Sequence, residues 1–234
     1  MSTMSLFRRR NNLPDFVQTY LATTRPARKL PWREVRYCAL DIETTGLNPQ
    51  QDTLVAIGLV EIVAGRVELG THWYTLVQPP KDTPVVADSI RVHGILQRDL
   101  THAATITQLL PALLERIRGQ VLIVHVAAVD IQFLNRILQQ HYRIRLRGPA
   151  IDTARVAVTL HHAERLHRGY DEALPSLSLR TLSEKNNIPP VLPEHHALND
   201  ALTTAQLFLA QATRLEQHGA TTLRGLLRAG GCLR

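Results

Sequence analysis

Apolar residues along this chain fall into two kinds of run, and their order predicts its elements. Short continuous or alternating apolar runs are typical of strands, whereas apolar residues three or four positions apart predict amphipathic helices. Strands are expected over residues 35–42, 53–63, 66–77, 121–126 and 150–152. Helices are expected over residues 106–117, 129–141, 153–160, 177–186 and 197–218.

The order of these runs predicts the fold class. Ala64 and Gly65 separate the second run from the third and predict a β-hairpin turn, and Pro79-Pro80 ends the hairpin. A hairpin followed by alternating strands and helices predicts an α/β fold, a mixed sheet flanked by helices. Carboxylates at the strand ends would converge at one edge of such a sheet.

The N-terminal region predicts one more helix. Asn12 could cap it, Pro14 would lie in its first turn, and apolar residues from Leu13 to Leu21 would share one face. This face must dock on another part of the protein, and the main domain is the expected place. Residues 23–32 are rich in Pro and Arg, as is typical of a linker. We therefore expect a basic extension (1–34), one domain (35–218) and a short basic tail (219–234).

Charge is distributed unevenly along the chain, and this distribution bears on the kind of ligand that the protein binds. Residues 1–36 carry a net charge of +6 and residues 214–234 carry +3, whereas residues 37–213 carry −2. Basic ends beside a slightly acidic body suit a nucleic-acid ligand. The extension would then raise affinity for nucleic acid. Alternatively, its helix packs on the domain and the charged ends are simply solvated.

The cysteines and the apolar runs indicate the cellular compartment in which the protein is expected. Cys38 lies in an apolar run and is expected in the core, and with only Cys232 besides it the chain has no disulfide framework. A reducing cytoplasm is the expected compartment. No apolar segment follows Arg8–Arg10 as in a secretory signal, and the apolar stretch 121–129 is too short to span a bilayer. No membrane association is expected.

The first candidate site group comes at the end of the first strand. Asp41 and Glu43 are two residues apart, so in a strand both side chains lie on one face. Two adjacent carboxylates repel each other, and a divalent cation such as Mg²⁺ or Mn²⁺ would remove that penalty. Thr44, Thr45 and Gly46 follow, and the glycine would allow a close backbone approach to a ligand. The alternative is a solvated strand end.

Two further groups lie later in the chain. Asp130 opens the helix after the fourth strand, where it could serve the site or simply favour the helix dipole. Asp200 lies in the last long helix, and His195 lies in the loop before it. A histidine on a loop can accept a proton from water because its pKa is near the working pH. The alternative for His195 and His196 is an incidental surface pair.

Taken together, these segments resemble the three motifs of the DEDD exonuclease superfamily. The matching segments are Asp41-x-Glu43-Thr-Thr-Gly, His125-x-Ala-x-x-Asp130 and His195-x-Ala-Leu-x-Asp200-Ala201. A histidine five residues before the last aspartate indicates the histidine subclass, which contains the epsilon proofreading subunit of bacterial replicative polymerases, RNase T and oligoribonuclease. The tyrosine subclass has Tyr where this chain has His196. The resemblance covers residues 36–213, and Val92-His93-Gly94-Ile95 and Ile151-Asp152-Thr153 are similar to secondary patterns of the proofreading-like branch.

The resemblance implies an RNase H-like fold and 3′→5′ exonuclease activity that uses two Mg²⁺ or Mn²⁺ ions and releases nucleoside 5′-monophosphates. It implies that Asp41, Glu43 and Asp200 hold one ion, that Asp41, assisted through water by Asp130, holds the other, and that His195 takes a proton from the attacking water. Thr44, Thr45, Gly46 and His93 are candidate substrate contacts. The expected partner is a nucleic-acid 3′ end, DNA rather than RNA.

Several alternatives stay open at this point. The chain could be a polymerase-associated proofreading or interaction subunit, an RNA-directed 3′ exoribonuclease, or a binding module that has lost activity. It departs from the family at Val126, where Asn is frequent, and at Val129, where an aromatic residue is frequent. Arg143, Arg145 and Arg147 alternate with apolar residues and would form a basic stripe in an extended segment, either for phosphates or along a sheet edge.

Overall fold

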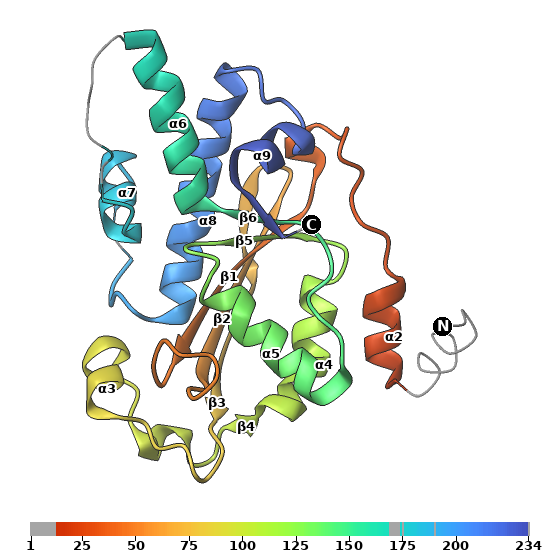
Figure 1. Cartoon of the computed structure of the whole chain (residues 1–234), viewed down its shortest axis with the longest axis vertical. Coiled ribbons are helices and arrows are strands. Elements are labelled where there is room, and N and C mark those ends of the chain that lie inside the picture. Colours follow the sequence, from red (N-terminus) through yellow and green to blue (C-terminus); the bar gives the residue numbers. More distant parts are fainter. Residues whose placement is uncertain (1–12, 169–173, 175, 190, 234) are drawn as a thin grey trace.

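A computed structural model of the chain describes residues 13–168, 174, 176–189 and 191–233. Across these residues a seven-stranded sheet of order β4-β3-β2-β1-β5-β6-β7 forms the centre, and helices cover both of its faces (Figure 1). The strands are β1 (Tyr37–Thr44), β2 (Leu54–Val63), β3 (Arg66–Gln78), β4 (Ala104–Thr105), β5 (Val121–Val124), β6 (Ala150–Asp152) and β7 (Gly231–Leu233). The helices are α2 (Asp15–Ala22), α3 (Ala87–His93), α4 (Ile106–Ile117), α5 (Asp130–Tyr142), α6 (Thr153–Arg168), α7 (Leu179–Lys185), α8 (Ala197–Gln217) and α9 (Leu223–Gly230), with short 3₁₀ turns at Trp32–Glu34 and Gln97–Leu100.

The predicted mixed sheet is confirmed. β1, β2 and β3 pair antiparallel, and β5 and β6 then add in parallel to the other side of β1. The hairpin turn between β2 and β3 lies at Ala64 and Gly65, which both have positive φ, as two-residue hairpin turns require. Helix α4 and strand β6 have the predicted bounds, whereas β5 ends two residues earlier than predicted and α6 continues past residue 160 to Arg168.

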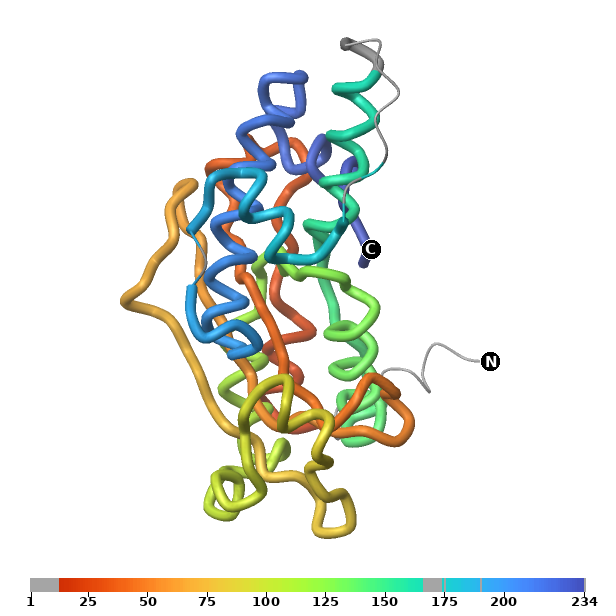
Figure 2. The backbone as a smooth tube through the Cα atoms, turned by 90° about the vertical axis from the view of Figure 1, so that its left-hand side faces the viewer, coloured from red at the N-terminus to blue at the C-terminus, as the bar shows by residue number. Residues whose placement is uncertain are grey.

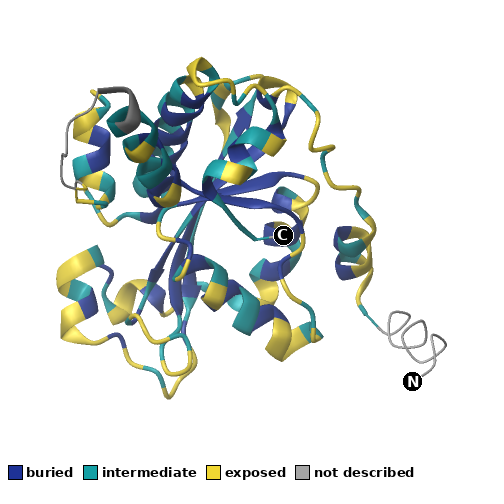
Figure 3. Cartoon of the chain, turned by 45° about the horizontal axis from the view of Figure 1, so that its top comes forward, coloured by how far each residue is buried: buried dark blue, intermediate teal, exposed yellow. Residues whose placement is uncertain are grey.

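Alternation along β1 divides the core between the two faces of the sheet (Figure 3). Cys38 and Leu40 pack with α4 and α5 on one face, and Cys38 is fully buried as predicted. Tyr37 and Ala39 pack with α8 and α9 on the other. Because side chains of a strand alternate, Asp41 and Glu43 continue the second series and lie on the face that α8 covers.

The N-terminal helix α2 docks on the main domain, as expected. Val17 and Tyr20 are buried, and the Tyr20 hydroxyl donates to the Arg147 carbonyl (3.2 Å) and accepts from the Arg147 N–H (2.7 Å). The predicted start was wrong, because α2 begins at Asp15 with Pro14 in the N-cap position. The expected cap, Asn12, lies outside the described residues, as do Arg8–Arg10.

Four elements were not predicted, namely α3, β4, α9 and β7. Residues 219–234 were expected as a basic tail, but up to residue 233 they extend the fold, because α9 buries Leu223 and Leu226 and β7 pairs with β6. The short length of these elements and the arginines in α9 hide them from periodicity. Within the described ranges, no helix has the length and apolarity needed to cross a membrane.

Candidate active site

The site begins where α8 meets β1 and β2. Gly58 of β2 is the register partner of Asp41, and a Cβ atom at Gly58 would lie 2.2 Å from the carbonyl of Ala197, far inside contact distance. Only glycine therefore lets the first turn of α8 lie directly on the sheet. That turn brings Asp200 to the two carboxylates of β1, so that one ligand atom from each of Asp41, Glu43 and Asp200 lies within 4.8 Å of the others.

Burial and like charge dominate the electrostatics of these carboxylates. Burial, with the charges of Asp130, Glu43 and Asp200, raises the pKa of Asp41 well above its usual range. Burial and the neighbouring charges of Asp200 and Asp130 raise the pKa of Glu43 to about 8, and Glu43 Oε1 is buried without a hydrogen-bond partner among the described residues. Burial also raises the pKa of Asp200, although the charge of His195 opposes this shift.

Asp130 is the fourth carboxylate near this group. It is the first residue of α5, it is 3% exposed, and burial raises its pKa to about 8. Its charge acts on Asp41 and Glu43, but it lies outside the group of three that could share one ion. We refer to Asp41, Glu43, Asp130 and Asp200 as the acidic cluster.

A separate carboxylate, Asp152 at the end of β6, holds the loop that leads to Asp130. Its oxygens accept hydrogen bonds from the N–H groups of Val126 (3.1 Å), Ala127 (3.0 Å) and Ala154 (2.9 Å). The loop residue Val126 has a φ of 58°, in the left-handed region that a β-branched residue avoids and Asn tolerates. The departure from the family at this position is therefore a source of local strain.

The histidines of the second and third motifs have different surroundings. Both ring nitrogens of His125 are hydrogen-bonded, Nδ1 to Thr153 Oγ1 (2.7 Å) and Nε2 to the Leu177 carbonyl (2.9 Å). The side chain therefore joins the loop after β5 to the start of α6 and to the segment before α7. His196 stacks on Tyr74, with ring centroids 4.3 Å apart. His195 is exposed beside Asp200 and has a φ of 55°.

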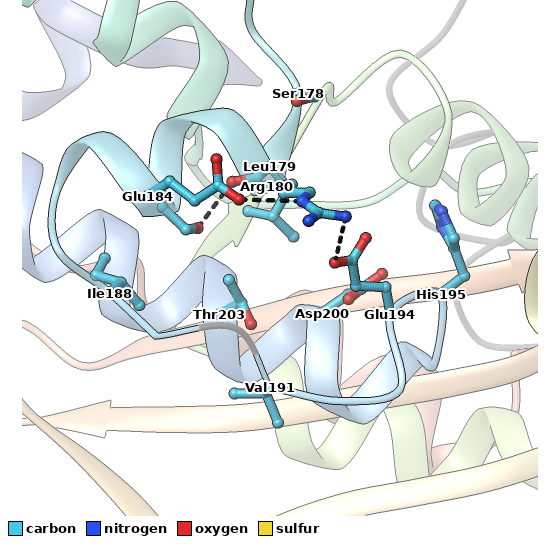
Figure 4. Close-up of a pocket in the computed structure, with 11 residues that line it drawn as sticks. Ser178, Leu179, Arg180, Glu184, Ile188, Val191, Glu194, His195, Asp200 and Thr203 are labelled. Carbon is cyan, nitrogen blue, oxygen red and sulfur yellow. Dashed lines mark hydrogen bonds and ion pairs between the residues drawn. The ribbon is translucent and has the colours of Figure 1, made fainter.

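The segment that carries His195 is tied down on both sides. Figure 4 shows Arg180 reaching from α7 toward Glu194, with an N–O distance of 3.3 Å, beside Asp200 and His195. The Asn199 side chain donates to the Pro193 carbonyl (3.0 Å). A cavity of about 260 Å³ between α7 and α8 adjoins Asp200 and His195. The exposed imidazole can therefore reach a substrate from a restrained loop.

The expected substrate contacts differ in their surroundings. Thr45 is buried and uses its hydroxyl inside the loop, donating to Asp52 Oδ1 (3.2 Å) and accepting from the Thr53 N–H (3.1 Å). Gly46 packs so closely on Asp52 that a Cβ atom would lie 2.6 Å from its carboxylate. Gly46 is therefore required for the packing of the loop, and its approach to a ligand stays a prediction. The hydroxyl of Thr44 donates to the Gly46 carbonyl (2.6 Å).

His93 lies at the end of α3 on the same side as the acidic cluster. Its Nδ1 accepts from the Ile95 N–H (3.0 Å), and its Nε2 is buried with no hydrogen-bond partner in the described part of the chain. Burial lowers the pKa of His93, a backbone hydrogen bond with Thr44 raises it, and the charge of the nearby His195 lowers it. His93 therefore lies close to both Thr44 at the end of β1 and His195.

Three supporting residues were not assigned these roles from the sequence, namely Gly58, Asp152 and Tyr74. A glycine within the apolar run of β2 was a usable signal, because glycine inside a strand often marks a close approach of another backbone. For Asp152 only its place in a secondary pattern was noted. Nothing local distinguishes Tyr74, whose partner His196 is distant in sequence.

Comparisons with known proteins agree with this geometry. The sequence model of the exonuclease family RNase T matches residues 38–208. The chain is 30% identical over 190 residues to the PolC-type DNA polymerase III of Thermotoga maritima, covering 81% of this chain but only 13% of that relative. It is also 30% identical over 177 residues to the DNA polymerase III subunit epsilon of Rickettsia prowazekii, covering 75% of this chain and 73% of that subunit.

A solved structure gives the same fold. The nuclease domain of 3′hExo, a DEDDh family member bound to rAMP, superposes with a TM-score of 0.61 at 18% identity, over 80% of this chain and 94% of that one. The sheet and its flanking helices therefore have the RNase H-like arrangement of exonuclease domains.

Proposed function

This chain belongs to the RNase T family of exonucleases, in the DEDD superfamily, and from that premise we propose that it is a metal-dependent 3′→5′ exonuclease. Its products would be nucleoside 5′-monophosphates and its main substrate DNA. One observation carries the proposal: three carboxylates from β1 and α8 converge within 4.8 Å, on a face where they repel each other. Such a group of ionised carboxylates costs stability unless a positive charge lies among them.

The residues of the cluster fit divalent cations. Hard carboxylate oxygens are the ligands that Mg²⁺ and Mn²⁺ prefer, and the buried Glu43 Oε1 has no hydrogen-bond partner among the described residues. We propose that Asp41, Glu43 and Asp200 hold one ion and that Asp41, with Asp130 acting through water, holds a second. When bound, the ions would lower the pKa of the attacking water and offset charge on the leaving oxygen.

The chain's own residues would complete the chemistry. We propose that His195 accepts the proton of the attacking water, because its exposed ring lies beside Asp200 and an imidazole nitrogen can accept a proton. Asp200 would favour the resulting imidazolium through its charge. The unpaired Nε2 of His93 would contact the substrate, and the restrained loop would keep His195 in reach.

DNA is favoured over RNA because both relatives named above belong to DNA polymerase III. The same relatives support a second candidate, a proofreading subunit that acts on the product of an associated polymerase. A stand-alone enzyme in the reducing cytoplasm and an RNA-directed exonuclease are the other arrangements that the same chemistry would serve. Copurification of a polymerase would favour the proofreading candidate.

A degradation assay with labelled oligonucleotides tests the proposal. A 5′-labelled DNA strand should shorten one nucleotide at a time in Mg²⁺ or Mn²⁺ and stay intact in EDTA, with 5′-monophosphates as the other product. An equally labelled RNA strand of the same sequence should be degraded more slowly. Release of the 5′ label as the first product would contradict the proposed polarity, and degradation that is equal in EDTA would contradict metal dependence.

A further inference from the structure

A polar groove runs along α5 and begins at Gln132, two residues after Asp130 of the acidic cluster. Its volume is about 470 Å³. One wall is the loop after β1, and the other is the outer face of α5 with the segment that follows. Both views of the backbone place this loop beside α5 (Figure 2). The lining residues are Pro49, Gln50, Gln132, Asn135, Arg136, Gln139, Gln140, Arg143 and Arg145.

The amphipathic pattern of α5 explains this composition. Phe133, Leu134, Ile137 and Leu138 are buried in the core, so the intervening positions face outward. After α5 ends, Arg143, Arg145 and Arg147 are exposed while Leu146 is buried, and the segment is not part of a strand. Of the three arginines of the predicted basic stripe, Arg143 and Arg145 line the groove.

The walls of the groove are fixed to each other before any ligand binds. Arg136 Nη2 donates to the Asp52 carbonyl (2.6 Å) and so joins α5 to the loop after β1. The Asn135 side chain accepts from the Leu146 N–H (2.8 Å) and joins α5 to the basic segment. A ligand would therefore find its contacts already in place, which reduces the entropy that binding costs.

The charge and hydrogen-bonding groups of the groove select the kind of ligand. No acidic residue lines it, and in the described part of the chain Arg143, Arg145 and Arg147 form no ion pair. Four glutamines and an asparagine add neutral amide groups. Unpaired guanidinium groups with amide donors suit phosphate and sugar oxygens, which nucleic-acid proteins contact without reading sequence.

The position of the groove connects it to the site. Asp130 begins α5, which forms one wall of the groove, and Asp41 and Glu43 lie in β1, which leads into the loop that forms the other wall, whereas Asp200 comes from α8. Along α5, with a rise of about 1.5 Å per residue, the 13 residues from Asp130 to Tyr142 span about 20 Å. A strand whose end lies at the acidic cluster could follow this path for more than one nucleotide.

We infer that this groove binds the sugar–phosphate backbone of the nucleic acid upstream of the cleaved nucleotide. The inference rests on the proposed function for the location of the strand's end. The groove would hold the substrate strand without sequence preference and would supply part of the affinity that the negatively charged cluster cannot. Its contribution should be seen in binding and in the salt dependence of binding.

The test compares Arg143→Gln/Arg145→Gln with a control pair of equal charge change, Arg224→Gln/Arg228→Gln on the exposed face of α9. Both pairs are made in an Asp200→Ala background so that the probe is not degraded. Fluorescence anisotropy with single-stranded and blunt duplex DNA 12-mers measures the Kd against salt. Gln139→Glu/Gln140→Glu is a second groove variant, which adds negative charge and keeps the arginines.

Loss of two phosphate contacts should weaken single-strand binding roughly tenfold or more at low salt and should reduce the slope of log K against log salt by about 1.4. The second groove variant should also weaken binding, and the control pair should bind like its parent. A loss confined to the duplex would overturn the assignment of the groove to the substrate strand, because the single-stranded probe carries only that strand.

Unchanged affinity and slope for both groove variants, or an equal loss in the control pair, would overturn the inference. Hydrolysis of a dinucleotide by the unmodified protein, measured in parallel, tests the proposed function separately because a dinucleotide has a single phosphodiester and does not need the groove. Failure of the groove and failure of the nuclease assignment are therefore distinguishable.

Discussion

Asp152 and the acidic cluster both place carboxylates inside the fold, yet their surroundings are opposite. Asp152 accepts three backbone N–H bonds and ties together the start of α6 and the loop before α5. In the acidic cluster, burial and mutual repulsion raise the pKa of Glu43 to about 8, and one of its oxygens has no partner among the described residues.

The difference separates a structural carboxylate from a functional one. The chain supplies three backbone N–H donors to the Asp152 carboxylate, and such bonds stabilise a fold. In the acidic cluster, Glu43 Oε1 has no partner among the described residues, and burial raises the pKa of all four carboxylates, so the ionised cluster lowers stability until something else neutralises it. Strained or repulsive groups of this kind gather at functional sites. The comparison leads to opposite expectations for substitutions at the two places.

The largest effect is expected from Asp41→Ala or Asp200→Ala. Either change removes a proposed ligand, and loss of several kcal/mol of transition-state stabilisation should reduce turnover by at least ~10²-fold. The melting temperature of the metal-free protein should stay the same or rise, because a repelling charge is gone. Turnover assays and thermal melting of each variant test this expectation. Turnover close to that of the unmodified protein would contradict the functional role of the acidic cluster.

The next largest difference is expected between the adjacent residues His195 and His196. His195→Ala should reduce turnover by ~10²-fold or more, the usual effect of losing a general base. His196→Ala should matter much less for turnover, since that ring stacks on Tyr74. Rates on the same 5′-labelled strand give both values. If His196→Ala had the larger effect, the assignment to the histidine subclass would be refuted.

Asp152→Asn should have the reverse signature of the cluster variants. The amide group would face a backbone N–H donor in place of an oxygen, at a cost of ~1–3 kcal/mol in the free energy of unfolding. The melting temperature should fall by several degrees, because ~1 kcal/mol shifts a domain of this size by ~2–4 °C. Thermal denaturation without metal tests this. A rise in melting temperature would show that Asp152 belongs with the cluster.

The smallest effect is expected at Val126, in the loop that Asp152 holds. Val126→Asn should raise the free energy of unfolding by ~1 kcal/mol, because Asn tolerates the left-handed conformation that Val adopts there. Differential scanning calorimetry would detect the gain of a few degrees. Val126→Ile, which keeps the β-branch, is the matched control and should give no such gain.

The sequence predicted the elements whose pattern is local. The strands β1 to β3 and the helix α4 followed from periodicity, and the Asp41, Asp130 and His195–Asp200 motifs followed from resemblance and local spacing. The close approach of α8 to Gly58 could not be predicted, because it depends on two segments distant in the chain. The same holds for the three bonds of Asp152, which depend on how its neighbours fold around it.

The short elements were missed for a different reason. Strand β7 has three residues and is defined by its pairing with β6, and helix α9 mixes three leucines and two arginines with two glycines in eight residues. Neither is long enough for periodicity to establish it. The basic groove likewise required the structure, since the residues of its two walls lie far apart in the sequence.

The pH dependence of stability tests the account most directly. The pKa of Glu43 and of Asp130 is raised from 4.5 and 3.8 to about 8, so between these values the folded protein binds more protons than the unfolded chain. Stability should therefore fall as the pH rises through this interval and level off above it. A cation that binds the ionised cluster in the folded state alone should offset the loss.

The measurement is the melting temperature from about pH 5 to about pH 8, in EDTA and in millimolar Mg²⁺ or Mn²⁺, over the interval that linkage predicts. We expect a fall with pH in EDTA that the cation largely reverses at the upper end, and no such reversal in Asp41→Ala. The same pH dependence with and without the cation, or an equal response in Asp41→Ala, would contradict the claim that the acidic cluster is a metal site.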